Sequence, residues 1–477
     1  MFLLYSVEFP RSAYTPRKNC GMLVHESGPC PLHDASHNFL NDKESVKEMN
    51  HMLRHDPIYD CYCEILKSEL QMATGCTEPI ALAYCAAKAR AELHAMPERV
   101  LVRVSGNIIK NVKSVTVPNT GGLKGIKAAV AAGIVAGNEN GALQVLACVN
   151  EEQYTGIKRF LSNTPIRVES MDDGDLLDME VTVYAGPHHA AVHICKSHTH
   201  IQEILFDGST RFCDNLTLSP QDTQADYSLL DTRRICEFAG CLEIEDLDGV
   251  IRRQIECNTA IANEGLRAGW GADIGGALLQ AYGQDVRIRA RALAAAGSDA
   301  RMSGCEMPVV INSGSGNQGL TVSLPVIEYA KEYGKSDDEL QRALAVANLC
   351  AIHQKAAIGK LSAFCGAVTA GSAAGAGIAY LLTKDCTVVE HTIVNALAIV
   401  SGMICDGAKP SCAAKISSAI DAAILGFEMF QRGHEFYGGD GILSKGIENT
   451  ISNVGKLGRE GMRETDRKIL EIMTSDQ

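Results

Sequence analysis

The chain has 477 residues, of which 46% are hydrophobic and 21% are charged, and its formal net charge is −13. A chain of this length exceeds one ordinary hydrophobic core, so we expect two domains. The acidic balance argues against nucleic acid and against an anionic membrane surface as partners, because both attract basic protein surfaces.

The 18 cysteines raise the question of the redox compartment. The N-terminal residues lack the basic start, the sustained apolar run and the small-residue cleavage site of a secretory signal. No segment reaches the roughly 20 uncharged apolar residues of a membrane-spanning helix. The sequence therefore predicts a cytoplasmic protein whose cysteines are reduced thiols, available for metal binding.

Residues 1–50 follow neither the period of a helix nor the period of a strand. They contain scattered prolines and cysteines, among them Pro10, Pro16 and Cys20. We interpret them as an irregular leader or extension and leave them out of the fold prediction.

Residues 51–248 are predicted to form a mixed α/β domain. Helical patterns predict helices at residues 59–71, 79–94 and 128–137. Runs of alternating or β-branched residues predict strands at residues 99–105, 143–150, 166–170, 177–184 and 190–194. The acidic residues 203–248 are interpreted as a solvated connector to a second domain.

Residues 249–477 are rich in Ala and Gly and are predicted to form a mainly helical domain. Helices are expected at residues 250–266, 275–296, 338–355, 387–404 and 411–432, with one strand at residues 307–312. The predicted fold class is therefore α+β, with the mixed domain preceding the helical one.

Three cysteines stand at predicted helix breaks, where side chains from different elements can converge. Cys76 directly precedes a helix, so we expect its thiol to ionise easily beside the unpaired N–H groups of the helix start. Cys365 lies in a Gly/Ser-rich passage, and Cys405 lies at a helix end before Gly407 and Pro410. Taken singly, each of the three is as well explained as a buried structural cysteine.

Several motifs along the chain, taken together, resemble those of a known family, which no single cysteine could indicate. They are GCTEP at residues 75–79, SGNIIKN at 105–111, SGSGNQG at 313–319, FCGA at 364–367, CDGAK at 405–409 and the terminal stretches 441–455 and 461–466. In this order they resemble the L-cysteine desulfidase family, which is related to the alpha chain of iron–sulfur L-serine dehydratases. The resemblance runs from about residue 57 to the C-terminus.

The resemblance implies a [4Fe–4S] cluster held by Cys76, Cys365 and Cys405, with one iron free of protein thiolate. An iron with an open position acts as a Lewis acid, which suits elimination. The implied reaction is β-elimination of L-cysteine to pyruvate, ammonia and hydrogen sulfide, without pyridoxal phosphate. Two alternatives stay open: an L-serine dehydratase on the same scaffold, and a non-catalytic iron–sulfur sensor.

The remaining site residues are predicted from their positions near these motifs. Candidates for the base that removes the α-proton are Lys110, His353 and Lys355, with Lys360 as a further lysine. The candidates for substrate binding are Ser105, Asn107, Asn111, Asn317 and Gln318. The expected partners are a small amino-acid substrate and further copies of the chain in a homo-oligomer, a dimer being the simplest.

Residues 313–319 also match the G-x-G-x-x-G pattern of dinucleotide-binding loops. We disfavour a dinucleotide site, because the residues that follow, from Leu320 to Pro325, do not look like the start of a helix. A loop of backbone amides that binds the substrate carboxylate is the preferred interpretation, and a glycine-rich turn without a ligand is the alternative.

Overall fold

The computed structural model describes residues 52–475 apart from 172–174, 215–224, 268 and 360–361. By their contacts, the residues from His51 to Gln477 form one compact unit. The predicted leader and Lys360 lie outside the described residues. The predicted division at residue 248 stays a prediction.

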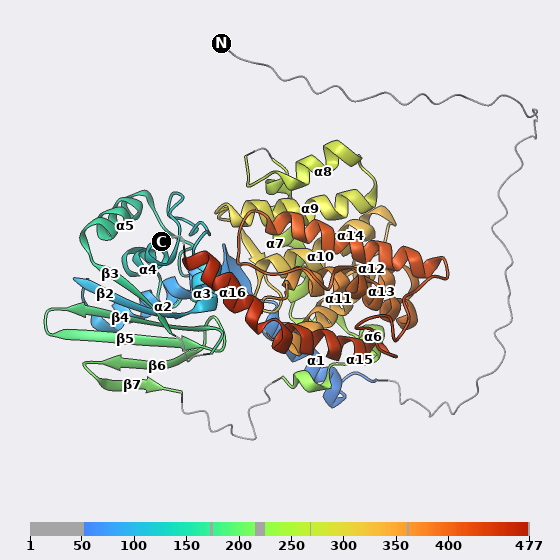
Figure 1. Cartoon of the computed structure of the whole chain (residues 1–477), viewed down its shortest axis with the longest axis horizontal. Coiled ribbons are helices and arrows are strands. Elements are labelled where there is room, and N and C mark those ends of the chain that lie inside the picture. The colour runs from blue at the N-terminus through green and yellow to red at the C-terminus, as the bar shows by residue number, and fades with distance from the viewer. Residues whose placement is uncertain (1–51, 172–174, 215–224, 268, 360–361, 476–477) are drawn as a thin grey trace, which may run out of the picture. The chain divides into compact units, whose positions relative to one another are not determined.

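The N-terminal part of this unit contains a six-stranded sheet (Figure 1). Its strands, in spatial order, are β3 (Ile166–Met171), β2 (Arg99–Ser105), β4 (Asp178–Ala185), β5 (His188–Cys195), β6 (Ile201–Phe206) and β7 (Ser209–Cys213). Only the β2–β3 pair is parallel, and the other neighbours are antiparallel. The valines of β2 at positions 100, 102 and 104 are buried on one face, as the alternating pattern predicts.

Helix α2 (Thr77–Leu93) covers this sheet and carries Cys76 at its N-cap. Most of α2 is buried, because the sheet lies on one side and α4 (Ile126–Ala136) packs on another. The remaining helices of this part are α1 (Pro57–Glu69), α3 (Gly106–Val112) and α5 (Glu151–Asn163). The three helices predicted at residues 59–71, 79–94 and 128–137 are thus confirmed within a few residues.

Two predictions for this part are wrong. The strand expected at 143–150 is instead the short 3-10 helix η1 (Ala142–Gln144) followed by Asn150, the N-cap of α5. The predicted connector holds β6, β7, η2 (Tyr227–Leu229), α6 (Thr232–Cys241) and η3 (Ile244–Leu247). Its acidic composition is compatible with regular structure because some of the carboxylates cap helices, as Asp226 does for η2 and Asp231 for α6. The edge strand β7 was missed because all its side chains are exposed, so it pairs through its backbone without an apolar face.

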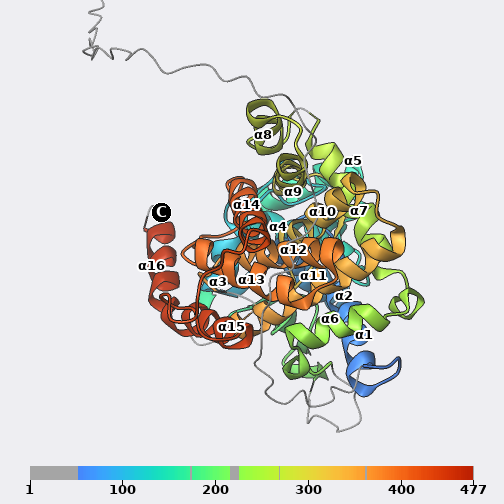
Figure 2. The ribbon, with the colours of Figure 1, turned by 90° about the vertical axis from the view of Figure 1, so that its right-hand side faces the viewer.

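The C-terminal part is mainly helical, as predicted (Figures 1 and 2). Its helices are α7 (Val250–Gly265), α8 (Ile274–Tyr282), α9 (Val286–Met302), α10 (Gly316–Glu332), α11 (Asp337–Ile358), α12 (Gly366–Thr383), α13 (Cys386–Val400), α14 (Cys412–Gln431), α15 (Ile447–Lys456), the π-helical turn η4 (Leu457–Gly461) and α16 (Arg463–Thr474). The α+β fold class is confirmed.

Helix α12 is packed among α10, α11, α13 and α14. It is the one described helix whose length and composition would allow it to span a membrane, but 83% of it is buried inside the protein. Its sequence, GAVTAGSAAGAGIAYLLT, is dominated by small residues, which let neighbouring helices approach closely. This burial is typical of a core helix.

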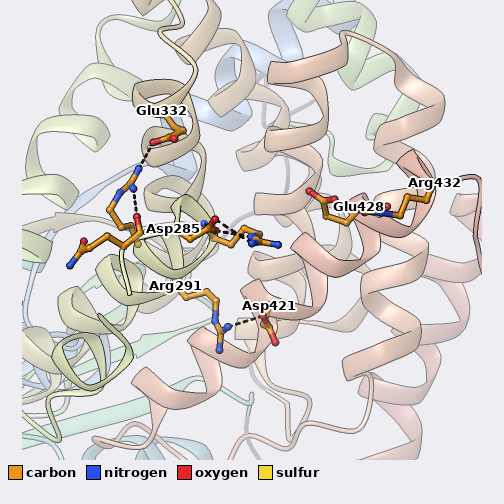
Figure 3. A network of polar contacts seen from close by, with 9 residues as sticks. Asp285, Arg291, Glu332, Asp421, Glu428 and Arg432 are labelled. Atoms are coloured by element: carbon orange, nitrogen blue, oxygen red, sulfur yellow. Dashed lines mark hydrogen bonds and ion pairs between the residues drawn. The ribbon is translucent and has the colours of Figure 1, made fainter. Parts of the chain in front are cut away.

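The single helix predicted at residues 275–296 is two helices, α8 and α9. Gly283, with φ +86°, ends α8, and Asp285 caps the start of α9 through a hydrogen bond from the Arg287 N–H. Along the outer face of α9, Arg291 pairs with Asp421 of α14 at 2.8 Å (Figure 3). Arg289 pairs with Glu332 of α10 at 2.7 Å. These ion pairs link three neighbouring helices.

The glycine-rich motif at 313–319 does open a helix, contrary to our prediction. Helix α10 begins at Gly316, and the Ser315 side chain caps it by accepting from the Gln318 N–H. The hydroxyls of Thr321 and Ser323 donate to carbonyls four residues earlier, which satisfies their polar groups inside the helix. A dinucleotide site is still not indicated, because the preceding strand β8 (Pro308–Val310) pairs antiparallel with β1 (Met72–Thr74) and is not part of a parallel βαβ unit.

Candidate active site

A cavity of about 110 Å³ lies where elements from both parts of the sequence meet. The predicted site residues on its wall are Cys76, Lys110, Asn111, Asn317, Gln318, Lys355, Cys365 and Cys405. This volume is well below the roughly 300–1,000 Å³ of pockets for drug-sized ligands. The cavity therefore suits a small molecule.

Cys76 reaches the cavity because the β1–β8 pair holds the segment before it against the segment that leads into α10. The thiol is buried, and its Sγ donates to Glu78 Oε2 at 3.2 Å. Burial and the Glu78 carboxylate raise the pKa of Cys76, whereas the Arg301 guanidinium acts in the opposite direction. Desolvation thus outweighs the helix start at Cys76, which is contrary to the expectation of an easily ionised thiol.

Cys365 and Cys405 are brought together by a short antiparallel contact between two loops. The bridge joins Phe364 and Ile404. The Cys405 N–H donates to Ala363 O at 2.6 Å, and the Cys365 N–H donates to Met403 O at 3.1 Å. This pairing places the two thiols side by side on the cavity wall, although 40 positions separate them in the sequence.

The two neighbouring thiols differ in acidity. The hydrogen bond from Cys365, followed by the charge of Lys110, lowers the pKa of Cys405 against the opposing effect of burial. The same contact, together with burial, raises the pKa of Cys365. Opposite shifts of this kind are expected when two titrating groups interact directly.

Two of the three lysines on the cavity wall, Lys110 and Lys355, are buried and have different surroundings. Lys110, on α3, has a side chain that is 1% exposed, and its Nζ lies 2.5 Å from Asp466 Oδ1 on α16. Lys355, on α11, is also buried, but within the described part of the chain its Nζ has no hydrogen bond or ion pair. Burial lowers the pKa of Lys355. The two amines are therefore not equivalent in the site.

Glu78 is a cavity residue that we did not single out, although it stands within the GCTEP motif. Its carboxylate accepts from Cys76 Sγ, from Thr77 Oγ1 at 3.0 Å and from Asn111 Nδ2 at 3.1 Å. Thr77 Oγ1 also lies 3.0 Å from Gly314 O. Glu78 thus connects α2, α3 and the loop before α10.

Arg301 is a second residue that sequence reasoning missed. It stands in the last turn of α9, is 2% exposed and lines the cavity. Its Nη1 donates to Asn317 Oδ1 at 3.0 Å. The predicted helix ended at residue 296, so Arg301 fell outside it, although two charged residues, Asp299 and Arg301, directly follow this Ala-rich stretch.

Cys412, at the first position of α14, is a fourth thiol on the cavity wall and was also missed. Its Sγ donates to Gly407 O at 3.7 Å. Burial raises the pKa of Cys412. The shift of Cys412 is therefore opposite in direction to that of Cys405.

Three predicted site residues do not line this cavity. His353 points toward α15, where its Nε2 lies 2.6 Å from Glu448 Oε2. Ser105 precedes α3, and its Oγ donates to Leu176 O at 2.8 Å. Asn107 is buried in α3 away from the cavity wall. The SGNIIKN motif starts a helix whose later residues, Lys110 and Asn111, are those that reach the cavity.

Comparisons with known proteins identify the family of the chain. The model of the serine dehydratase alpha chain family matches residues 125–471, so the chain belongs to this family. Within it, the chain is similar to a UPF0597 protein of Desulfitobacterium hafniense, with 53% identity over 422 residues, which are 88% of this chain and 98% of that protein. A UPF0597 protein of Lachnoclostridium phytofermentans is 49% identical over 416 residues, 87% of this chain and 100% of that protein.

The matched range includes Cys365 and Cys405 but begins after Cys76. Among the residues that the structure describes, no three His, Cys, Asp or Glu side chains gather closely enough to hold a single metal ion. The cavity thiols are nevertheless a donor set of soft ligands in a buried site with cationic neighbours, which is the chemistry that iron–sulfur clusters require.

Proposed function

We propose that this protein is an iron–sulfur lyase that eliminates hydrogen sulfide from L-cysteine to give pyruvate and ammonia. The observation that carries the proposal is the convergence of Cys76, Cys365 and Cys405 on one small cavity that three lysines also line. Membership of the serine dehydratase alpha chain family supports the same class of reaction.

The residues on the cavity wall fit a [4Fe–4S] cluster. Cys76, Cys365 and Cys405 would hold it as thiolates, and the positive charge of Lys110 offsets part of their negative charge. When bound, the cluster supplies an open iron that acts as a Lewis acid toward the leaving sulfur. Cys412, hydrogen-bonded to Gly407, is not among the proposed ligands.

Lys355 is the better candidate for the base. Lys110 Nζ is already engaged by Asp466, whereas Lys355 Nζ has no acidic partner in the described chain. In the proposed step, Lys355 takes the α-proton, the electrons of the Cα–H bond form the Cα=Cβ double bond, and the Cβ–S bond breaks with release of sulfide. The enamine then tautomerises and reacts with water to give pyruvate and ammonia, which balances the reaction.

L-Serine is the second candidate substrate, and the description of the matched family favours it. Water would then replace hydrogen sulfide as the product of elimination. We prefer L-cysteine because the motif that contains Cys76 resembles the desulfidase family and lies outside the matched range. A non-catalytic iron–sulfur sensor is the third possibility and needs no elimination activity.

The test is iron and sulfide analysis of anaerobically purified protein, with assays of sulfide release from L-cysteine and of pyruvate from L-serine. We expect about four iron atoms per chain and faster turnover of L-cysteine. Faster turnover of L-serine would favour the dehydratase, and a full cluster without either activity would favour the sensor. Protein without iron after reconstitution would contradict all three.

Single Cys→Ser variants test the ligand assignment. Cys76→Ser, Cys365→Ser and Cys405→Ser are expected to lose most of the bound iron. Cys85→Ser is the matched control, because Cys85 is a fully buried thiol on the same helix as Cys76 that donates to Val192 O at 3.2 Å away from the cavity. Cys412→Ser is expected to keep its iron, and loss of iron in this variant would show a fourth thiolate ligand.

The proposed base is tested with Lys355→Gln. Removal of a general base lowers kcat by about 10²- to 10⁴-fold. Lys331→Gln is the control, since Lys331 is a surface residue of α10 whose side chain is 56% exposed. A Lys355→Gln variant with a full cluster and unchanged kcat would remove Lys355 from the mechanism.

A further inference from the structure

The guanidinium of Arg301 is buried without an acidic partner. No ion pair of Arg301 occurs among the described residues, and its one hydrogen bond is the Nη1 contact to Asn317. Its Nε and Nη2 are buried and have no hydrogen-bond partner in the described chain. An uncompensated buried charge costs several kcal/mol, so such a group normally has an anion beside it.

The two unpartnered nitrogens have a specific geometry. Nε and Nη2 form one edge of the planar guanidinium, and their two N–H groups point in parallel from that edge. A carboxylate is the anion that matches two parallel donors, because its two oxygens accept them as a bidentate pair. The Asn317 contact uses the remaining nitrogen, Nη1, so neither donor of this edge is occupied by a described residue.

The surrounding residues preserve the space that the guanidinium needs. Gly316, the first residue of α10, lies so close that a Cβ there would be 2.3 Å from Arg301 Nε. The helix start at Gly316 adds its own positive partial charge to the same region. Glycine at this position lets a cation approach a helix start, an arrangement that repels other cations and attracts an anion.

Two other cations of the cavity have carboxylate partners. Lys110 pairs with Asp466, and Lys415 pairs with Asp406 at 2.6 Å. Among the described residues, Glu78 is the one carboxylate on the cavity wall, and its oxygens accept from Cys76, Thr77 and Asn111. Arg301 and Lys355 are therefore the cavity residues without a carboxylate partner in the described chain, and of these two only Arg301 offers a pair of parallel donors.

A second unpartnered atom faces the same cavity. Gln318 is buried against Gly366, the residue that follows Cys365, and its Oε1 has no hydrogen-bond partner in the described chain. An amide oxygen accepts hydrogen bonds from an ammonium group. An α-amino acid needs donors for its carboxylate and an acceptor for its ammonium group. Arg301 and Gln318 offer these two kinds of group on one cavity wall.

We propose that Arg301 binds the α-carboxylate of the amino-acid substrate through Nε and Nη2. This assignment rests on the proposed function, because the cavity must be the substrate site. It assigns to Arg301 the carboxylate binding that the sequence had suggested for the backbone amides of residues 313–319. Arg301 then determines specificity for free α-amino acids over their esters and amides.

The test separates carboxylate binding from elimination by using a ligand that cannot react. L-Alanine has the α-carboxylate and the ammonium group but no leaving group, and L-alaninamide lacks the negative charge. Binding of both to the cluster-loaded protein is measured by calorimetry, beside kcat and KM for L-cysteine and L-cysteine methyl ester. The variants are Arg301→Gln and Arg301→Lys.

Wild type is expected to bind L-alanine about 10- to 100-fold more tightly than L-alaninamide, the range for charge-assisted hydrogen bonds. Arg301→Gln is expected to lose this preference and to raise KM for L-cysteine, with unchanged iron content. Arg301→Lys restores the charge but not the paired donors, so it is expected to recover part of the preference. Arg291→Gln, on the outer face of the same helix (Figure 3), is expected to behave as wild type.

Three outcomes would overturn the assignment. An Arg301→Gln variant that keeps the preference for L-alanine would show another carboxylate partner. A variant that loses iron would show that Arg301 compensates Cys76 rather than substrate. Wild type that eliminates from L-cysteine but does not discriminate L-alanine from its amide would keep the proposed function and reject the role of Arg301. Discrimination without elimination would keep the carboxylate site and reject the proposed function.

Discussion

The buried cations of the cavity differ in what offsets their charge. Lys110 has Asp466 on α16, whereas Lys355 and Arg301 have no carboxylate partner in the described chain. In water each charge would be solvated, but inside the protein it needs a nearby anion. The chain thus leaves two basic side chains without a carboxylate partner next to the space where we place the cluster and the substrate carboxylate.

Because the Lys110–Asp466 ion pair is buried, we expect its loss to lower the free energy of unfolding more than the loss of an exposed ion pair does. Asp466→Ala leaves a buried ammonium without its partner, so the free energy of unfolding is expected to fall by about 3 kcal/mol. Asp421→Ala removes the partner of Arg291, but the Asp421 side chain is 59% exposed. This control is expected to cost less than about 1 kcal/mol. Denaturant titration measures both, and equal losses would contradict the prediction.

At the scale of elements, small residues decide how closely helices approach. Gly133 of α4 lies against α2, where a Cβ would be 2.1 Å from Ala83 O. Because the contacting atoms belong to the backbone, they have no rotamer that relieves the overlap. The position of α2, and with it the position of Cys76, therefore depends on the glycine in its neighbour.

Gly133→Ala is expected to lower the free energy of unfolding by about 1–3 kcal/mol, the usual cost of overpacking. Gly240→Ala is the matched control, because Gly240 lies within α6 and a Cβ there meets no atom within 4 Å. Alanine favours a helix over glycine, so this control is expected to be neutral or stabilising. The melting temperatures of the two variants give the comparison, and a stabilised Gly133→Ala variant would contradict the packing argument.

The β4–β5 pair contains an ion pair that titrates. His193 Nε2 lies 2.6 Å from Asp178 Oδ1, and this hydrogen bond raises the pKa of His193 against the effect of burial. A raised folded-state pKa means that the pair contributes fully below the unfolded pKa of about 6.5. Its contribution is lost as the pH rises through the folded pKa.

As the pH rises from 6 to 8, loss of the charge on His193 is therefore expected to lower the free energy of unfolding of the wild type by up to about 1 kcal/mol. His193→Gln removes the titrating group and is expected to be less stable than wild type at pH 6 and nearly equal to it at pH 8. Urea titrations at both pH values measure the difference. A difference that grows with rising pH would have the wrong sign for this pair.

For the whole molecule, contacts between distant segments join the two halves of the sequence. The β1–β8 pair, the Lys110–Asp466 ion pair and the shared cavity each combine residues from before and after position 248. The two regions that the sequence predicts as separate domains thus share part of their interior. The oligomeric state stays a prediction.

These shared contacts predict coupled unfolding of the two regions. Trp270 is the single tryptophan and lies in the C-terminal region, so its fluorescence reports on that region alone. Circular dichroism follows the whole chain. The two denaturant transitions are expected to coincide, which is the test for a cooperative unit. A separate earlier or later fluorescence transition would favour two independent domains.

Much of the secondary structure was readable from the sequence, because it depends on local patterns. The buried valines of β2 alternate, and α11 begins at the Ser336 capping box. Helix α10 was not readable, because its glycines and Pro325 disfavour a helix that tertiary packing then stabilises. Strand β7 was missed for the opposite reason, since an exposed edge strand lacks an apolar pattern.

By itself, the sequence determined the α+β class and the motifs that contain the three cysteines. Only the tertiary structure decided which residues share a cavity. It brought Arg301, Glu78 and Cys412 to the wall and left His353, Ser105 and Asn107 away from it. The physical reason is that a motif specifies residue types along the chain, whereas convergence depends on long-range pairing such as Phe364 with Ile404. Burial, which sets the acidity of the thiols, likewise arises only when those segments meet.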